Sequence, residues 1–286
     1  MGQMEKTEQT EQEAQSMHTR QRERALGDRW RDWSGISGST LKLIAVVTML
    51  IDHIAAGVLV RLYLASRNGD ILPTYYLMRN IGRIAFPIYC YMIVEGLKYT
   101  RNKWKYALRL GVFALVSEIP FDLGFQSKIL EFGYQNVYFT LCIGLLTIIG
   151  IEYVERKLPE KILGWKPQLS AHIVDILIRL SVLLLSAFGM GAAALCRSDY
   201  DWMGVLCIVI LYLARGGKAL QLGLGYLAFG IFLGEWVAFP AFLLLILYKG
   251  KKGFSCKALF YGFYPVHLLA LYLVCVLMHI AQYSAL

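Results

Sequence analysis

Long apolar runs follow one another along most of the chain and are separated by short polar segments. Their lengths and spacing predict nine membrane-spanning helices. The expected spans are residues 41–64, 81–99, 106–125, 137–154, 172–195, 201–214, 218–233, 236–249 and 257–282, of which the seventh and eighth are short. The pattern therefore predicts an all-α, polytopic transmembrane bundle.

The first 38 residues do not follow this pattern. They begin MGQMEKTEQTEQEAQS, which is polar and has no apolar core, and we expect a cytoplasmic tail over residues 1–38. Near its end, the stretch LGDRWRDWSG predicts a short segment at the membrane surface, because Trp30 and Trp33 stand among arginines. Residues 39–286 then form one transmembrane domain.

Composition and charge support this interpretation. Of 286 residues, 57% are hydrophobic and 17% are charged, which is more apolar surface than a soluble domain of this size can bury. The net charge of +9 comes from short clusters of cations between apolar runs, which is typical of cytoplasmic loops rather than of nucleic-acid binding. We expect a multi-pass protein of the plasma or inner membrane, in contact with lipid and with no nucleic-acid partner.

The loops predict the orientation of the bundle. With the N-terminus inside, every even-numbered connection is cytoplasmic. These connections carry KYTRNKWK, ERKLPEKILGWK, the short RGGK and KGKKGFSCK, whereas the opposite loops carry few cations or offset them with acids. The sequence therefore predicts a cytoplasmic N-terminus and an external C-terminus.

The first span holds two ionisable side chains at its centre, in VVTMLIDHIAAGVL. Lys42 and His53 are eleven residues apart, so both lie on one helix face, with His53 roughly 16 Å above Lys42. Asp52 points about 100° away and needs a partner on another helix. Buried charges of this kind cost about 2.5 to 3.5 kcal/mol each on insertion scales, which favours a functional role.

Further charges lie in the next two spans and in the last. Arg79 and Arg83 share one face, as do Glu118 and Asp122, and their similar height predicts pairing between the two helices. For these four residues, structural and substrate-binding roles are both open. Glu95 lies near the inner end of the second span, and in the last span GFYPVHLL places His267 at mid-bilayer, with Tyr264 one turn below it. Two imidazoles from the first and last spans can therefore face a common cavity, although a single His in a span is more often a packing residue.

Several of these segments resemble the successive motifs of the TraX family. They are LKLIAVVTMLIDHI, RNIGRIAFPIYCYMIVEG, YALRLGVFALVSEIPFD, QNVYFTL, SDYDWMGV and YPVHLL, in order from about residue 40 to 270. TraX is associated with N-terminal acetylation of pilin, so the resemblance implies an acetyl-CoA-dependent acetyltransferase at the membrane. The functional positions implied by motif are Lys42, Asp52, His53, Arg79, Arg83, Glu95, Glu118, Asp122, Asn136 and His267.

The first span is also similar, more weakly, to that of the membrane acyltransferase-3 superfamily, which places a basic residue eleven before a His. On this interpretation His53 is the general base, oriented by Asp52 or by an acid of the third span. The nucleotide of acetyl-CoA, as co-substrate, is expected near Lys42, Arg101, Lys103 and Lys105. Arg79 and Arg83 would bind the acceptor or the developing oxyanion.

The acceptor is expected to present an amine or a hydroxyl, as a pilin-like peptide or a surface glycan does. No metal-ligand spacing is evident, so no metal is expected. The alternative is a proton-coupled transporter, because intramembrane Asp, Glu and His chains also form proton relays, although its usual paired repeats are absent. A non-enzymatic scaffold explains the apolar bulk but not the cost of the buried charges.

The predicted orientation can be tested by labelling single cysteines from either side of the membrane. We expect the loop around Arg101 to be labelled only from the cytoplasm and a cysteine at the C-terminal Leu286 only from outside, because the cations follow the even-numbered connections. Labelling of both positions from one side would rule out nine spans.

Overall fold

The computed structural model describes residues 35–254 and 257–284. In these ranges every named element is a helix, and there is no β-strand. Most of the predicted tail, including the segment with Trp30 and Trp33, lies outside the described residues. In chain order the elements are α2 (Gly38–His53), η1 (Ile54–Leu59), α3 (Val60–Ser66), α4 (Ile71–Gly82), α5 (Ala85–Tyr99), α6 (Lys103–Gln126), α7 (Val137–Trp165), α8 (Ala171–Leu195), α9 (Asp201–Leu213), α10 (Lys218–Leu233), η2 (Trp236–Ala238), α11 (Phe239–Leu247) and α12 (Lys257–Leu277).

Four of the described helices are long and apolar enough to cross a membrane. They are Gly38–Ser66, Val137–Trp165, Ala171–Leu195 and Leu259–Leu277. Several other apolar helices are shorter than a bilayer requires, namely Asp201–Leu213, Lys218–Leu233 and Trp236–Leu247. The all-helical prediction is confirmed for the described residues, and the chain is a membrane protein. The count of nine spans stays a prediction.

One helix differs from the predicted pattern. The second span was expected to begin at residue 81, but α5 begins at Ala85 and is preceded by a separate helix, α4. Pro73 lies in the first turn of α4, where its missing N–H has no intrahelical acceptor to lose. Because of the polar stretch SRNGD and this proline, the pattern predicts a connection here. The structure instead has a helix that starts only five residues after α3 ends.

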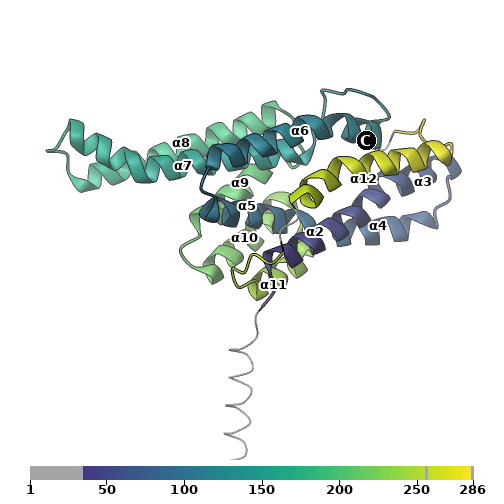
Figure 1. Cartoon of the computed structure of the whole chain (residues 1–286), viewed down its shortest axis with the longest axis horizontal. Helices are drawn as coiled ribbons and strands as arrows, with labels where there is room; N and C mark the ends of the chain where they lie inside the picture. Colours follow the sequence, from purple (N-terminus) through teal and green to yellow (C-terminus); the bar gives the residue numbers. More distant parts are fainter. Residues whose placement is uncertain (1–34, 255–256, 285–286) are drawn as a thin grey trace, which may run out of the picture.

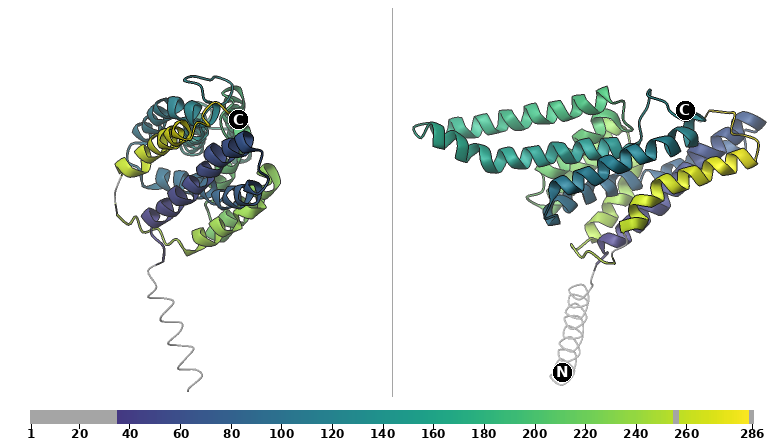
Figure 2. Two further views of the ribbon diagram at one scale, coloured as in Figure 1. Left: turned by 90° about the vertical axis from the view of Figure 1, so that its right-hand side faces the viewer. Right: turned by 45° about the horizontal axis from the view of Figure 1, so that its top comes forward.

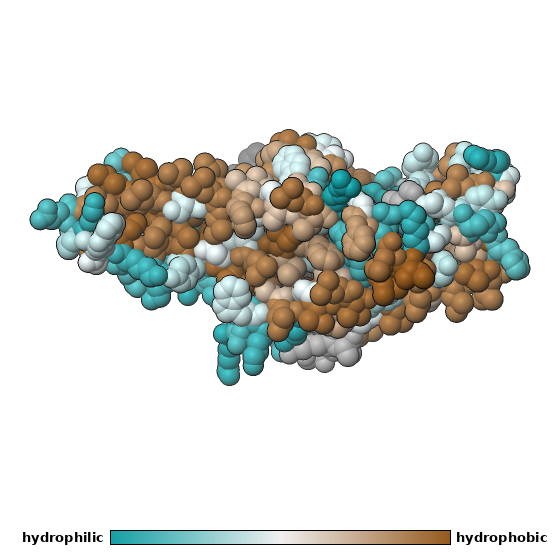
Figure 3. Space-filling model, turned by 90° about the horizontal axis from the view of Figure 1, so that it is seen from above, coloured by the Kyte–Doolittle hydropathy of each residue, from teal (hydrophilic) through white to brown (hydrophobic). Residues whose placement is uncertain are grey.

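The helices form one elongated bundle. Helices α2, α4 and α12 lie side by side, while α7 and α8 form an antiparallel hairpin that extends beyond the rest (Figure 1, Figure 2). The outer face of α8 exposes large apolar side chains, among them Leu183, Leu184 and Phe188. Apolar side chains cover much of the face seen in Figure 3, and polar ones gather at its ends, along its lower edge and in a patch right of the middle. Such a surface requires a lipid environment.

The basic connections meet at one end of the bundle. The start of α2 is bonded to the α11–α12 connection, with the Gly38 N–H donating to the Lys251 carbonyl at 2.7 Å. A cavity of about 1030 Å³ at this end is lined by residues of the α5–α6, α9–α10 and α11–α12 connections. We call this the basic end; the opposite end carries the α3–α4 connection and the end of α12.

At the opposite end, a fully buried arginine joins three elements. Arg61 of α3 donates to the carbonyls of Tyr283 at 2.7 Å and Gly57 at 3.0 Å, and to Ser127 Oγ at 2.9 Å. It also donates to the Gly124 carbonyl near the end of α6. Gly57 belongs to η1, a π-helix that directly follows His53, so Arg61 fixes this wide turn against α6 and the C-terminal segment.

We expect Arg61→Met to destabilise the protein. The variant leaves several buried acceptors without a donor, each at a cost of about 1–3 kcal/mol, so the free energy of unfolding should fall by about 3 kcal/mol or more. Unfolding in detergent micelles measures this loss. Arg61→Lys keeps the charge but not the fork of donors, and should recover only part of the stability; wild-type stability of Arg61→Met would show that the bonds contribute nothing.

Candidate functional site

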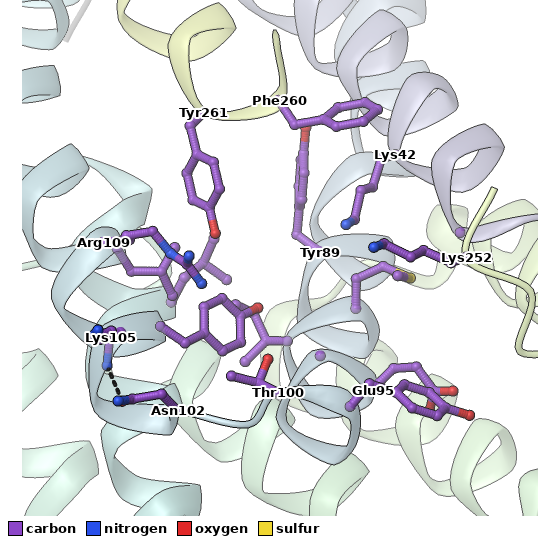
Figure 4. A pocket seen from close by; sticks show the side chains of 18 of the residues that line it. Lys42, Tyr89, Glu95, Thr100, Asn102, Lys105, Arg109, Lys252, Phe260 and Tyr261 are labelled. Carbon is purple, nitrogen blue, oxygen red and sulfur yellow. Dashed lines mark hydrogen bonds between the residues drawn. The ribbon is translucent and has the colours of Figure 1, made fainter. Parts of the chain in front are cut away.

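The first part of the candidate site is a cavity of about 620 Å³ at the basic end, between α2, α5, α6 and α12. Five cations line this cation-lined cavity, against one acid, Glu95. The cations are Lys42, Arg101, Lys105, Arg109 and Lys252, and Figure 4 shows four of them around a shared space. Tyr89, Phe260 and Tyr261 supply aromatic walls, with Lys42 Nζ 5.7 Å from the centroid of the Phe260 ring. Excess positive charge beside aromatic rings suits an anion attached to a planar group.

The structure brings together three of the four cations predicted to bind the donor. Lys42, Arg101 and Lys105 line the cavity, but Lys103 does not. Lys103 forms an ion pair with Glu152 of α7, because a step of two residues along α6 turns the side chain to another face of the helix. The prediction for Lys103 is therefore corrected.

Sequence reasoning missed two cations of this cavity. Arg109 follows Lys105 by four residues, so helical spacing alone could have placed both on one face. Lys252 lies in the α11–α12 connection, and no local pattern in the sequence brings that loop to α2.

The second part is a smaller cavity of about 150 Å³ among α2, α4, α5 and α6. We call it the histidine cavity, because His53 lines it together with Asp52, Arg79 and Arg83. Among the residues described, only Tyr89 lines both the histidine cavity and the cation-lined cavity. The two cavities therefore approach each other at the middle of α5.

His53 is hydrogen-bonded to the second predicted histidine. Its Nδ1 lies 2.7 Å from His267 Nε2, and His267 Nδ1 lies 2.7 Å from the Phe263 carbonyl oxygen. Because a carbonyl only accepts, His267 Nδ1–H is the donor, and neutral His267 then accepts at Nε2. His53 must donate through Nδ1–H, which leaves the lone pair of its Nε2 to accept a proton.

Aromatic side chains hold this pair of imidazoles in place. The His53 ring contacts Phe125 edge-on, with centroids 5.3 Å apart, and Tyr264 at 5.8 Å. Tyr264 also contacts His267, and both are buried. The two imidazoles meet, as predicted, but only His53 lines the histidine cavity. His267 lies behind it, and no acid takes the orienting place expected of Asp52.

The ion pairs of the site differ from the predicted ones. Arg79 pairs with Asp52 at 2.6 Å and Arg83 with Glu235 at 2.9 Å, so neither pairs with an acid of α6. The first pair forms because α4 lies directly against α2 at Gly82, where an added Cβ would stand 2.2 Å from the Asp52 Cβ. Glu235 was missed, although it is the one acid in a long apolar stretch.

The acids of α6 instead organise the loop before α7. Asn136 donates to Glu118 through Nδ2 and caps α7 by accepting from the Tyr138 N–H at 3.0 Å. Asp122 accepts from the Glu131 N–H at 2.7 Å. Both acids bond the segment before α7, while Arg79 and Arg83 pair with other acids, so the predicted pairing of Glu118 and Asp122 with the arginines is wrong. Within the described ranges, no group of three His, Cys, Asp or Glu side chains could hold a metal ion.

Comparison with known proteins is consistent with this geometry. A family model described as "TraX protein" matches residues 37–275. The chain belongs to the TraX family. It is also 28% identical over 262 residues to "Probable fimbrial assembly protein FimC, serogroup H1" of Dichelobacter nodosus, a match that covers 81% of this chain and 93% of that protein. No solved structure matches the chain. The matched range includes every residue of the TraX chain named above for the two cavities.

A double-mutant cycle should show strong coupling between Asp52 and Arg79. Arg79→Gln leaves a buried carboxylate unpaired and should lower the free energy of unfolding by about 3 kcal/mol, and adding Asp52→Asn should recover part of the loss. The exposed pair Lys157 and Glu160 is the control, with an expected coupling below about 1 kcal/mol. Equal coupling in the two cycles would mean that the Asp52 pair is not shielded from water.

Proposed function

We propose that this TraX-family chain is a multi-pass acetyltransferase of the plasma or inner membrane, with its N-terminus in the cytoplasm. It moves the acetyl group of acetyl-CoA to an amine or hydroxyl of an acceptor at the membrane or on its outer side. The observation that carries the proposal is the pair of cavities that meet at Tyr89, one lined by cations and the other by His53.

The cation-lined cavity has the chemistry for the donor. Acetyl-CoA carries several phosphates and an adenine ring, and the cavity offers five cations and several aromatic rings. Lys42 and His53 are roughly 16 Å apart along α2, so the thioester at the end of the flexible arm must reach about that far from the phosphates. The donor would enter at the basic end, where the predicted cytoplasmic loops meet.

His53 has the geometry of a general base. Its Nε2 accepts a proton from the nucleophile as the acceptor attacks the thioester carbon, and returns it to the CoA sulfur as the C–S bond breaks. His267 is a positioning residue, because its bond to His53 Nδ1 fixes the tautomer and stabilises the imidazolium. Arg79 and Arg83, paired with Asp52 and Glu235, shape the other wall of the acceptor space.

The name of the relative supports a choice of acceptor class. FimC is named as a fimbrial assembly protein, and the acceptor proposed here is a pilin-like peptide, with a surface glycan as the second class. The histidine cavity is small, so an extended chain end fits better than a folded surface. Whichever acceptor binds must present its nucleophile next to His53.

The test is acetyl transfer by the purified full-length protein, measured as CoA thiol release and acetylated product. His53→Ala should lower kcat about 10²- to 10⁴-fold, as expected for loss of a general base, while acetyl-CoA still raises the melting temperature. The comparison variant, Lys105→Ala with Arg109→Ala, should raise the KM for acetyl-CoA and leave kcat nearly unchanged.

Two outcomes would contradict the proposal. If His53→Ala turns over like the wild type, the base lies elsewhere. The second outcome is a wild type that shows no acetyl-CoA-dependent thermal shift and no product, but carries protons across proteoliposome membranes. The protein is then a proton-coupled transporter, the alternative that the intramembrane acids and histidines also allow.

A further inference from the structure

Tyr89 lies on the turn of α5 where the two cavities approach each other. Among the described residues, it is the one that lines both cavities. In Figure 4 its ring stands between Tyr261 and Lys42, and its hydroxyl points toward Phe260, away from Glu95 and Thr100. A group that passes directly from the cation-lined cavity to the histidine cavity passes this ring.

The Tyr89 hydroxyl has no hydrogen-bond partner among the described residues, unlike two neighbouring tyrosines. Tyr134 donates to Asp199 at 2.6 Å, and Tyr138 donates to the Tyr261 carbonyl at 3.3 Å. That carbonyl is available because Pro265, four residues later, has no N–H to bond it. The Tyr89 hydroxyl is not among the fully buried, unpaired atoms of the described residues, so it opens onto the cavities that Tyr89 lines. A donor that bonds no described residue and opens onto the junction of two cavities can bond a ligand atom there.

Three other donors of the two cavities are engaged or distant. Arg79 and Arg83 are bonded to carboxylates, and Lys42 lies roughly 16 Å from His53 along α2. Tyr89 also stands on a rigid element. Phe86, one turn earlier in α5, stacks on Tyr200 with centroids 3.6 Å apart and an angle of 12° between the rings. A donor fixed in this way needs little reorganisation during a reaction.

We propose that the Tyr89 hydroxyl binds the thioester carbonyl oxygen of the donor and stabilises the negative charge that develops on it. This role rests on the proposed function. As the acceptor nucleophile attacks, the carbonyl π electrons move to oxygen, which accepts a hydrogen bond from Tyr89, and His53 Nε2 takes the proton of the nucleophile. The carbonyl then re-forms, the C–S bond breaks, and the thiolate takes that proton from His53. Tyr89 keeps its own proton throughout.

The test is Tyr89→Phe, which removes one oxygen and keeps the ring. Because that oxygen bonds no described residue, the fold should persist, and acetyl-CoA should raise the melting temperature as in the wild type. We expect kcat to fall about 10²- to 10³-fold, the usual loss for one oxyanion donor, with the KM for acetyl-CoA within about threefold of the wild type. Tyr91→Phe is the matched control, because Tyr91 is on the same helix, contacts Tyr248 and lines neither cavity. It should turn over like the wild type.

The outcomes separate this inference from the function on which it rests. A wild type that transfers no acetyl group and is not stabilised by acetyl-CoA defeats the proposed function. An active wild type with an equally active Tyr89→Phe variant overturns only the role of Tyr89. A variant whose KM rises while kcat stays the same also overturns it, because Tyr89 would then only bind the donor.

Discussion

An ionisable side chain inside an apolar bundle must be matched within the bundle, and this constraint arranges the structure around His53. Unmatched, each such group costs several kilocalories per mole. Asp52 is matched by Arg79, which fixes α4 against α2, and Arg83 is matched by Glu235, which fixes the start of α5 against the turn after α10. Arg61 is matched by carbonyls rather than by a carboxylate, and it closes the opposite end. His53 sits among elements whose positions these contacts determine.

The same constraint gives the site two distinct halves. Four cations of the cation-lined cavity are exposed at the basic end and can meet an anionic ligand there, namely Arg101, Lys105, Arg109 and Lys252. The arginines beside His53 lie deeper and are bonded to carboxylates, so their positive charge is largely balanced by these acids. The deep half is lined by both arginines of these ion pairs together with His53 and Tyr89, and His267 lies behind His53.

The sequence was informative where contacts are local and uninformative where they depend on tertiary packing. Apolar runs predicted the helices, and the spacing of Lys42 and His53 placed both correctly on α2, because helical geometry alone relates them. The meeting of His53 with His267 was expected from their depth. The partner of Arg79 was not, because α4 was not recognised as a helix, and no periodicity reveals which helix face packs against Gly82. The roles of these residues in catalysis remain predictions.

The π-helix η1 divides the first long helix into two parts that face different neighbours. A π-turn is equivalent to one residue added to an α-helix, so every position after it is turned by about 100° relative to a continuous helix. The part before η1 directs His53 toward the cavity, and the part after it directs Arg61 toward α6. Relatives that lack this extra residue would keep the histidine but present a different side chain to α6. An alignment gap between residues 54 and 59 therefore marks a difference in how the end opposite the basic end is closed, and not a difference at His53.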